Sequence, residues 1–171
     1  MIRWLLHKRI TAFERRWAHD CVYLHRIAQI SPLTAAKVTL LRSQPPPGAL
    51  PFGAYAAARI TATLAAECGS CLSLAIDMCE ADGFPRSSVE AIMAGKEPVM
   101  APDVRLGYRF ANAIVQRNAE ASARLGADIR GRWGDKAHLA MSMAVASAGL
   151  YPSLKRAFAV PGPAEVRRLA A

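Results

Sequence analysis

Two cysteines, Cys68 and Cys71, lie three positions apart with only a glycine and a serine between them. Thiols at this spacing can close a small disulfide and open it again, so the pair can exchange two electrons with a partner. The pair opens an expected helix, whose N-terminus favours the reactive thiolate form. The other cysteines, Cys21 and Cys79, fall among apolar residues and are expected to be buried and inert.

A metal site and a purely structural role are the alternatives to redox chemistry at this pair. A structural zinc site needs four ligands, and the chain has no second cysteine pair at ligand spacing. The histidines could meet the pair only through tertiary folding; they are His7, His19, His25 and His138. We therefore expect no metal and no other cofactor, and redox chemistry is the stronger interpretation.

The elements that position the pair are expected to be helices. The chain is rich in alanine, 53% of its residues are hydrophobic, and no segment alternates with a period of two. This pattern predicts an all-α fold. One helix is expected over about 52–66 and the next over about 68–81, ended by Gly83. The last helix, over 135–158, is expected to be bent or broken at Pro152.

The chain divides into three expected segments. Residues 1–44 form a basic helical extension, 45–160 a helical domain with the cysteine pair, and 161–171 a frayed tail. Within the extension, Ser31 before a proline predicts a helix start. The first helix is amphipathic, and we expect it to pack on the domain or on a partner subunit rather than on a membrane surface. Its apolar stripe consists of Ile2, Leu6, Ile10, Phe13 and Trp17.

The net charge of +9 is concentrated near the two ends of the sequence. Residues 1–44 hold eight basic and two acidic side chains, and residues 155–171 hold four and one. These charges lack interleaved aromatic residues, a zinc module or a reading helix, which argues against a nucleic-acid partner. No window offers the roughly 20 apolar residues of a transmembrane segment, and charges at 14–16 interrupt a signal peptide. We expect a cytoplasmic protein.

The segment around the cysteines resembles the AhpD-like, or carboxymuconolactone decarboxylase, superfamily. The similarity lies in Ala-Ala-Glu-Cys-Gly-Ser-Cys at 65–71, the apolar helix up to Gly83, and the segments 89–95 and 109–115. It covers roughly residues 50–155. The resemblance implies an AhpD-like helical bundle that assembles into a homo-oligomer. It also implies peroxide reduction or disulfide exchange, with recharging by a dithiol reductant or a lipoylated partner protein.

The resemblance further implies that Cys71 attacks the peroxide and that Cys68 resolves the product as a disulfide. The chain departs from the pattern at the proton relay of the redox-active members. Ala75 and Ser70 stand where that pattern has histidines, and Ala56 stands where it has a glutamate. A peroxidase needs groups that activate the thiol and protonate the leaving alkoxide.

Two nearby charged residues are the candidates to replace the relay. Glu67, one position before the first cysteine, could accept a proton, or it is simply a solvated acid. Arg59 could favour the thiolate if it approaches the pair, or it is an exposed or salt-bridged side chain. We expect a thiol–disulfide oxidoreductase or weak peroxidase that uses Cys68 and Cys71. The alternative is a non-catalytic, homo-oligomeric binding or scaffold protein that retains the fold.

Overall fold

Every regular element in the described part of the chain, residues 2–41 and 48–158 of the computed structural model, is a helix. The prediction of an all-α protein is therefore confirmed. The predicted segment boundary between residues 44 and 45 and the predicted tail at 161–171 lie outside the described residues. No helix of the described residues is long and apolar enough to cross a membrane.

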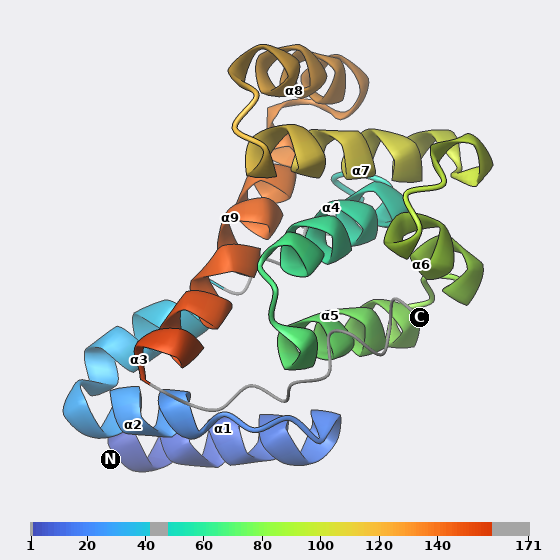
Figure 1. The fold of residues 1–171 in the computed structure, drawn as a ribbon. Coiled ribbons are helices and arrows are strands. Elements are labelled where there is room, and N and C mark those ends of the chain that lie inside the picture. Colours follow the sequence, from blue (N-terminus) through green and yellow to red (C-terminus); the bar gives the residue numbers. More distant parts are fainter. Residues whose placement is uncertain (1, 42–47, 159–171) are drawn as a thin grey trace.

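The first three helices pack on one another at one end of the molecule (Figure 1). They are α1 (Ile2–Trp17), α2 (Val22–Ile30) and α3 (Pro32–Leu40). The predicted cap at Ser31 is confirmed, because its side chain accepts a hydrogen bond from the Thr34 backbone N–H at 3.2 Å. The three helices share a core of their own, completed by Tyr151 and Leu154 of the last helix and by Phe158 just after it.

The rest of the described chain forms a second helical body. Its helices are α4 (Phe52–Ala65), α5 (Gly69–Ala81), α6 (Arg86–Met93), α7 (Pro102–Val115), α8 (Ala119–Trp133) and α9 (Asp135–Ala157), with a short 3₁₀ turn η1 (Glu97–Val99). Helix α4 lies at its centre and contributes to both of its hydrophobic cores. Helices α4 and α7 approach each other closely at Gly107 of α7. A Cβ at this position would collide with the backbone of Ala54 on α4.

Helix α9 connects the two bodies. It runs from α8 at the far end of the molecule to the α1–α3 group (Figure 1). We expected a bend or a break at Pro152; the helix is continuous through this residue, so the break is excluded. Pro152 is buried and lines the same helical face as Ala148. Tertiary packing on both sides holds the helix together where the proline removes a backbone hydrogen bond.

Candidate functional site

The two cysteines of the pair are joined by a disulfide, with their Cα atoms 5.3 Å apart. Cys68 is the N-cap residue of α5 in an extended backbone conformation, and Cys71 lies in the first helical turn. The first N–H groups of a helix have no intrahelical acceptor, and they carry a partial positive charge. The pair therefore lies where a thiolate is electrostatically favoured, as the sequence predicted.

Helix α5 starts one residue later than expected, and this changes the position of Glu67. The Glu67 backbone has a positive φ of 52°, so it belongs to the turn before the helix. Its side chain is exposed. Among the described residues, no hydrogen bond or ion pair of the Glu67 side chain reaches either cysteine. The turn is held instead by Arg156 of α9, whose guanidinium donates to the Ala66 carbonyl at 3.1 Å.

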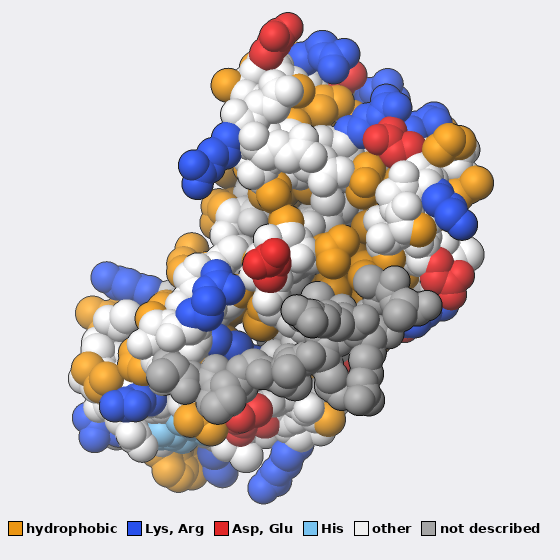
Figure 2. Space-filling view, viewed as in Figure 1, with side chains coloured by type: hydrophobic (Ala, Val, Ile, Leu, Met, Phe, Trp, Pro, Cys, Tyr) orange, Lys and Arg blue, Asp and Glu red, His pale blue; other side chains and the backbone are white. Residues whose placement is uncertain are grey.

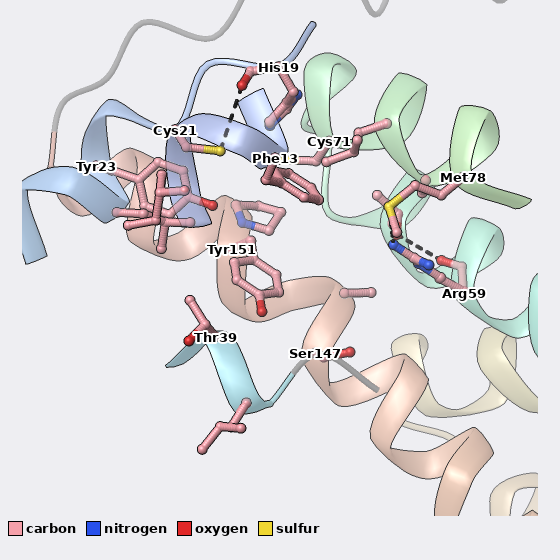
Figure 3. Close-up of a pocket in the computed structure, with 18 of the residues that line it drawn as sticks. Phe13, His19, Cys21, Tyr23, Thr39, Arg59, Cys71, Met78, Ser147 and Tyr151 are labelled. Atoms are coloured by element: carbon pink, nitrogen blue, oxygen red, sulfur yellow. Dashed lines mark hydrogen bonds between the residues drawn. The ribbon is translucent and has the colours of Figure 1, made fainter. Parts of the chain in front are cut away.

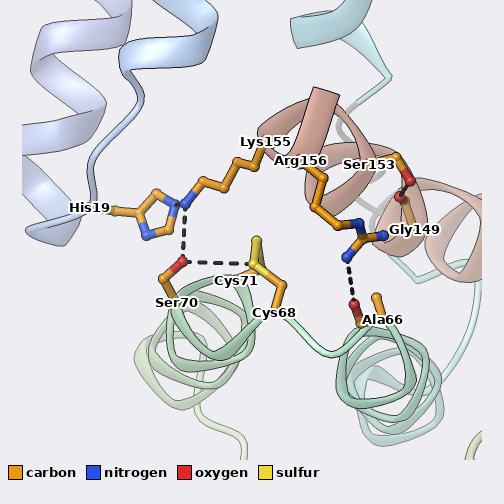
Figure 4. Close-up of a disulfide and its surroundings, with 9 residues drawn as sticks. All are labelled: His19, Ala66, Cys68, Ser70, Cys71, Gly149, Ser153, Lys155 and Arg156. Carbon is orange, nitrogen blue, oxygen red and sulfur yellow. Dashed lines mark hydrogen bonds between the residues drawn. A yellow bond between two sulfur atoms is a disulfide. The ribbon is translucent and has the colours of Figure 1, made fainter. Parts of the chain in front are cut away.

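A buried lysine from the other end of the chain reaches the serine between the two cysteines. Lys155 of α9 is only 6% exposed, and its Nζ donates to Ser70 Oγ at 3.0 Å (Figure 4). Ser70 Oγ in turn lies 3.7 Å from Cys68 Sγ. A disulfide sulfur carries no hydrogen, so the Ser70 hydroxyl is the donor in this weak contact. A hydrogen-bonded chain thus runs from the lysine ammonium to the first cysteine.

The same lysine contacts a buried histidine. Its Nζ lies 3.1 Å from Nε2 of His19, a residue 136 positions earlier in the connection between α1 and α2. Burial, and next the charge of Lys155, lower the pKa of His19 from 6.5 to about 4. Burial also lowers the pKa of Lys155. The imidazole is therefore neutral at pH 7, and its Nε2 lone pair accepts a hydrogen bond from the lysine ammonium.

This depressed pKa predicts a specific pH dependence of stability. Above pH 6.5 His19 is neutral in both states; between pH 6.5 and about 4 only the unfolded chain binds the proton. The free energy of unfolding should therefore fall by roughly 3 kcal/mol as the pH drops across this window. In His19→Gln this component should vanish, because the amide oxygen can accept from Lys155 without titrating. Urea unfolding at a series of pH values measures the free energy of unfolding of wild type and of His19→Gln. If this free energy depended on pH in the same way in both proteins, the buried neutral imidazole would be contradicted.

Sequence reasoning missed this lysine and left the histidine unassigned. From the sequence, Lys155 belongs to the basic segment 155–171. The position of Lys155 within α9 is informative, because Lys155 falls on the buried stripe of this helix. The stripe is formed by Met141, Ala144, Ala148 and Pro152. Lysine is rarely buried without a partner, so a lysine on an apolar stripe points to a buried polar contact. No local signal connects it to His19.

The second cysteine borders a cavity of about 260 Å³ between α1, α5 and α9 (Figure 3). Cys71 is only 8% exposed, and its side chain forms part of the cavity wall. Arg59 of α4 is half-buried in the same wall, and its Nη2 donates to the Met78 sulfur at 3.2 Å. The structure thus brings Arg59 and Cys71 to one cavity. Among the described residues no hydrogen bond joins the Arg59 guanidinium to either sulfur of the pair.

The remaining candidates from the sequence lie elsewhere. Cys79 is buried, which raises its pKa to about 11, and it is therefore protonated at pH 7. His7 and His25 stack on each other, and His25 Nε2 lies 3.0 Å from the Glu14 carboxylate. His138 packs edge-on against a phenylalanine of α7. Within residues 2–41 and 48–158, no group of three or more potential ligands could hold a metal ion.

Comparisons of the chain with protein-family models, with curated proteins and with solved structures found no match. The function is therefore argued from the geometry of the site.

Proposed function

We propose that the chain is a thiol–disulfide oxidoreductase whose redox centre is Cys68 and Cys71. The observation that carries the proposal is the contact of Ser70, between the two cysteines, with the buried ammonium of Lys155 at 3.0 Å. A structural disulfide has no need of a desolvated cation beside it, because burying that cation is costly. The reduction of a disulfide creates negative charge on sulfur, and a nearby cation stabilises that charge.

The contacts favour Cys68 as the thiolate of the reduced pair. In the dithiol form the Ser70 hydroxyl can donate to the Cys68 sulfur while it accepts from Lys155. The helix N-terminus adds its positive end at the same place. Hydrogen bonds to a charged form and a nearby opposite charge both lower the pKa of a thiol. This order is the reverse of the one implied by the AhpD-like resemblance, in which Cys71 attacks first.

The catalytic cycle balances with a disulfide substrate and a dithiol reductant. The Cys68 thiolate attacks a substrate disulfide, forms a mixed disulfide and releases one thiolate. Cys71 then loses its proton and attacks Cys68, which releases the second substrate thiolate and closes the Cys68–Cys71 disulfide. The substrate has gained two electrons, and both of its thiolates take protons from the site or from water. An external dithiol reduces the pair again by the same two exchanges.

A slow peroxidase reaction can use the same groups. A thiolate attacks the terminal oxygen of a hydroperoxide, becomes a sulfenic acid, and the leaving alkoxide takes a proton to form an alcohol. The second thiol condenses with the sulfenic acid, and water leaves. Lys155, through Ser70, is a proton source for the alkoxide. In this reaction Lys155 takes the role of the proton relay, because this chain has Ala56 and Ala75 at two of the relay positions.

The decisive test is the redox behaviour of the reduced protein. We expect one thiol with a pKa below the ordinary value of about 8.5, measured from the pH dependence of alkylation of the two residues. We also expect the Cys68–Cys71 disulfide to form reversibly in a glutathione buffer, followed by mass spectrometry of the alkylated peptides. Ordinary pKa values for both thiols, without reversible disulfide formation, would refute the redox function.

That negative outcome would favour the second candidate, a non-catalytic homo-oligomeric binding protein. The observation behind it is the exposed apolar surface of the α1–α3 group, where hydrophobic and basic side chains are mixed (Figure 2). Contiguous exposed apolar surface is typical of interaction sites. The exposed residues include Trp4, Ile30, Leu33 and Leu40. The same surface also supports the homo-oligomer that we propose for the oxidoreductase.

A further inference from the structure

The cavity beside Cys71 is a mostly apolar space whose walls come from helices of both bodies. Helix α1 supplies Ile10 and Phe13, α5 supplies Leu74, and α9 supplies Ala148. Figure 3 shows Phe13 of α1, Cys71 of α5 and Ser147 of α9 around this space. Pockets that hold small molecules are typically lined by apolar side chains with few polar groups. This cavity has that character.

The charged groups in the cavity wall are basic. Arg59 is half-buried, and its guanidinium donates to a thioether sulfur, which is a weak acceptor. In the described part of the chain, every ion pair joins other side chains, so no carboxylate neutralises Arg59. Arg9, an exposed residue of α1, borders the same space. No aspartate or glutamate of the described residues lines it.

A guanidinium among apolar side chains without a carboxylate partner is energetically unfavourable. An anionic ligand would remove this cost. The planar guanidinium presents parallel N–H groups, and these match the two oxygens of a carboxylate. Beyond Arg59 the wall is mostly apolar, with isolated hydroxyl groups such as those of Thr63 and Ser147. The apolar walls suit a hydrocarbon chain, which would leave water on entering the cavity.

We propose that this cavity binds a single-chain carboxylate amphiphile, of the fatty-acid class, with its head group on Arg59 and its hydrocarbon tail between α1, α5 and α9. The volume of about 260 Å³ lies slightly below the usual range for drug-sized ligands, so a medium-length chain is the appropriate size. The proposal does not depend on dithiol chemistry, because the ligand is held by Arg59 and the apolar walls.

The test is the binding of decanoate, measured by isothermal titration calorimetry below the concentration at which decanoate forms micelles. We expect saturable binding with one site per chain. Arg59→Met should weaken decanoate binding at least about tenfold, since it removes a charge-assisted hydrogen bond. Decanol, which has the same chain length without the charge, should bind wild type and Arg59→Met equally. Arg130→Met, a matched change at an exposed position of α8, should leave decanoate binding unchanged.

A second variant tests the location of the tail. Ala148→Phe adds a ring to the cavity wall and should abolish the binding of both decanoate and decanol. Circular dichroism of each variant checks that the helices are intact. The proposal is overturned if wild type shows no saturable decanoate binding, or if Arg59→Met binds decanoate as tightly as wild type does. The same titration on Cys68→Ser, which removes the disulfide at a residue outside the cavity wall, should give an unchanged affinity, which separates this ligand site from the redox function.

Discussion

A Cys71→Ser variant is expected to accumulate a stable mixed disulfide at Cys68, whereas a Cys68→Ser variant is expected to form none. In the proposed cycle the Cys68 thiolate attacks the substrate, and Cys71 is needed only to release it. Removing the second thiol therefore stops the reaction after the first exchange. Removing the first thiol stops it before any covalent intermediate forms. Both variants should lose turnover of a disulfide substrate completely.

Incubation with glutathione disulfide, followed by intact-protein mass spectrometry, measures the mixed disulfide directly. Cys79→Ser is the matched control, because Cys79 is a buried thiol outside the pair. It should retain wild-type turnover. The opposite pattern, with the adduct trapped on Cys71 in Cys68→Ser, would support the order implied by the AhpD-like resemblance. Wild-type turnover in either variant would rule out a two-cysteine mechanism.

The second large effect is expected at Lys155. A Lys155→Met variant keeps a side chain of similar length but removes the buried charge and its hydrogen bond to Ser70. The pKa of the lower-titrating thiol should rise by at least about one unit, since a nearby opposite charge typically lowers the pKa of an acidic group by about one to three units. The thiolate belongs to the reduced form, so the reduction potential should become more negative, by about 30 mV for each pKa unit.

Equilibration with glutathione buffers measures the potential, and the pH dependence of alkylation measures the pKa. Lys136→Met is the matched control, because Lys136 is an exposed lysine on the same helix. It should change neither value. A merely structural role for Lys155 would lower the stability of the variant and leave the thiol pKa where it was. That outcome would remove the lysine from the proposed mechanism.

Much of the helical framework follows from local sequence signals. Ser31 caps α3 as its sequence context predicts, and Gly83 takes a positive φ of 91° just after α5. These signals act within one helical turn, so they mark helix ends independently of how the helices pack. Helix α9 does not break at Pro152, one of the two outcomes expected there, because its packing against two bodies outweighs the loss of one backbone hydrogen bond.

The site was only partly predictable for a related reason. The cysteine pair is a local motif, and its position at the start of α5 could be read from the sequence. Whether Glu67 faces the pair depends on its own backbone φ, which is positive. The spacing of apolar residues in the sequence does not reveal this angle. The contact of His19 with Lys155 depends on how α1 and α9 approach each other. Contacts between residues so far apart in the chain are set by the packing of whole helices.

The order in which a ribosome delivers the chain gives the Lys155 contact a further consequence. Synthesis proceeds from the N-terminus, so His19 and both cysteines of the pair emerge well before α9 is complete. Until then Ser70 has no ammonium beside it, so the thiols of the nascent chain lack the contribution that we propose for Lys155. The proposed redox centre would be complete only when the last turns of α9 have packed against both bodies. A chain truncated before Lys155 would carry both cysteines and still lack the group that distinguishes them.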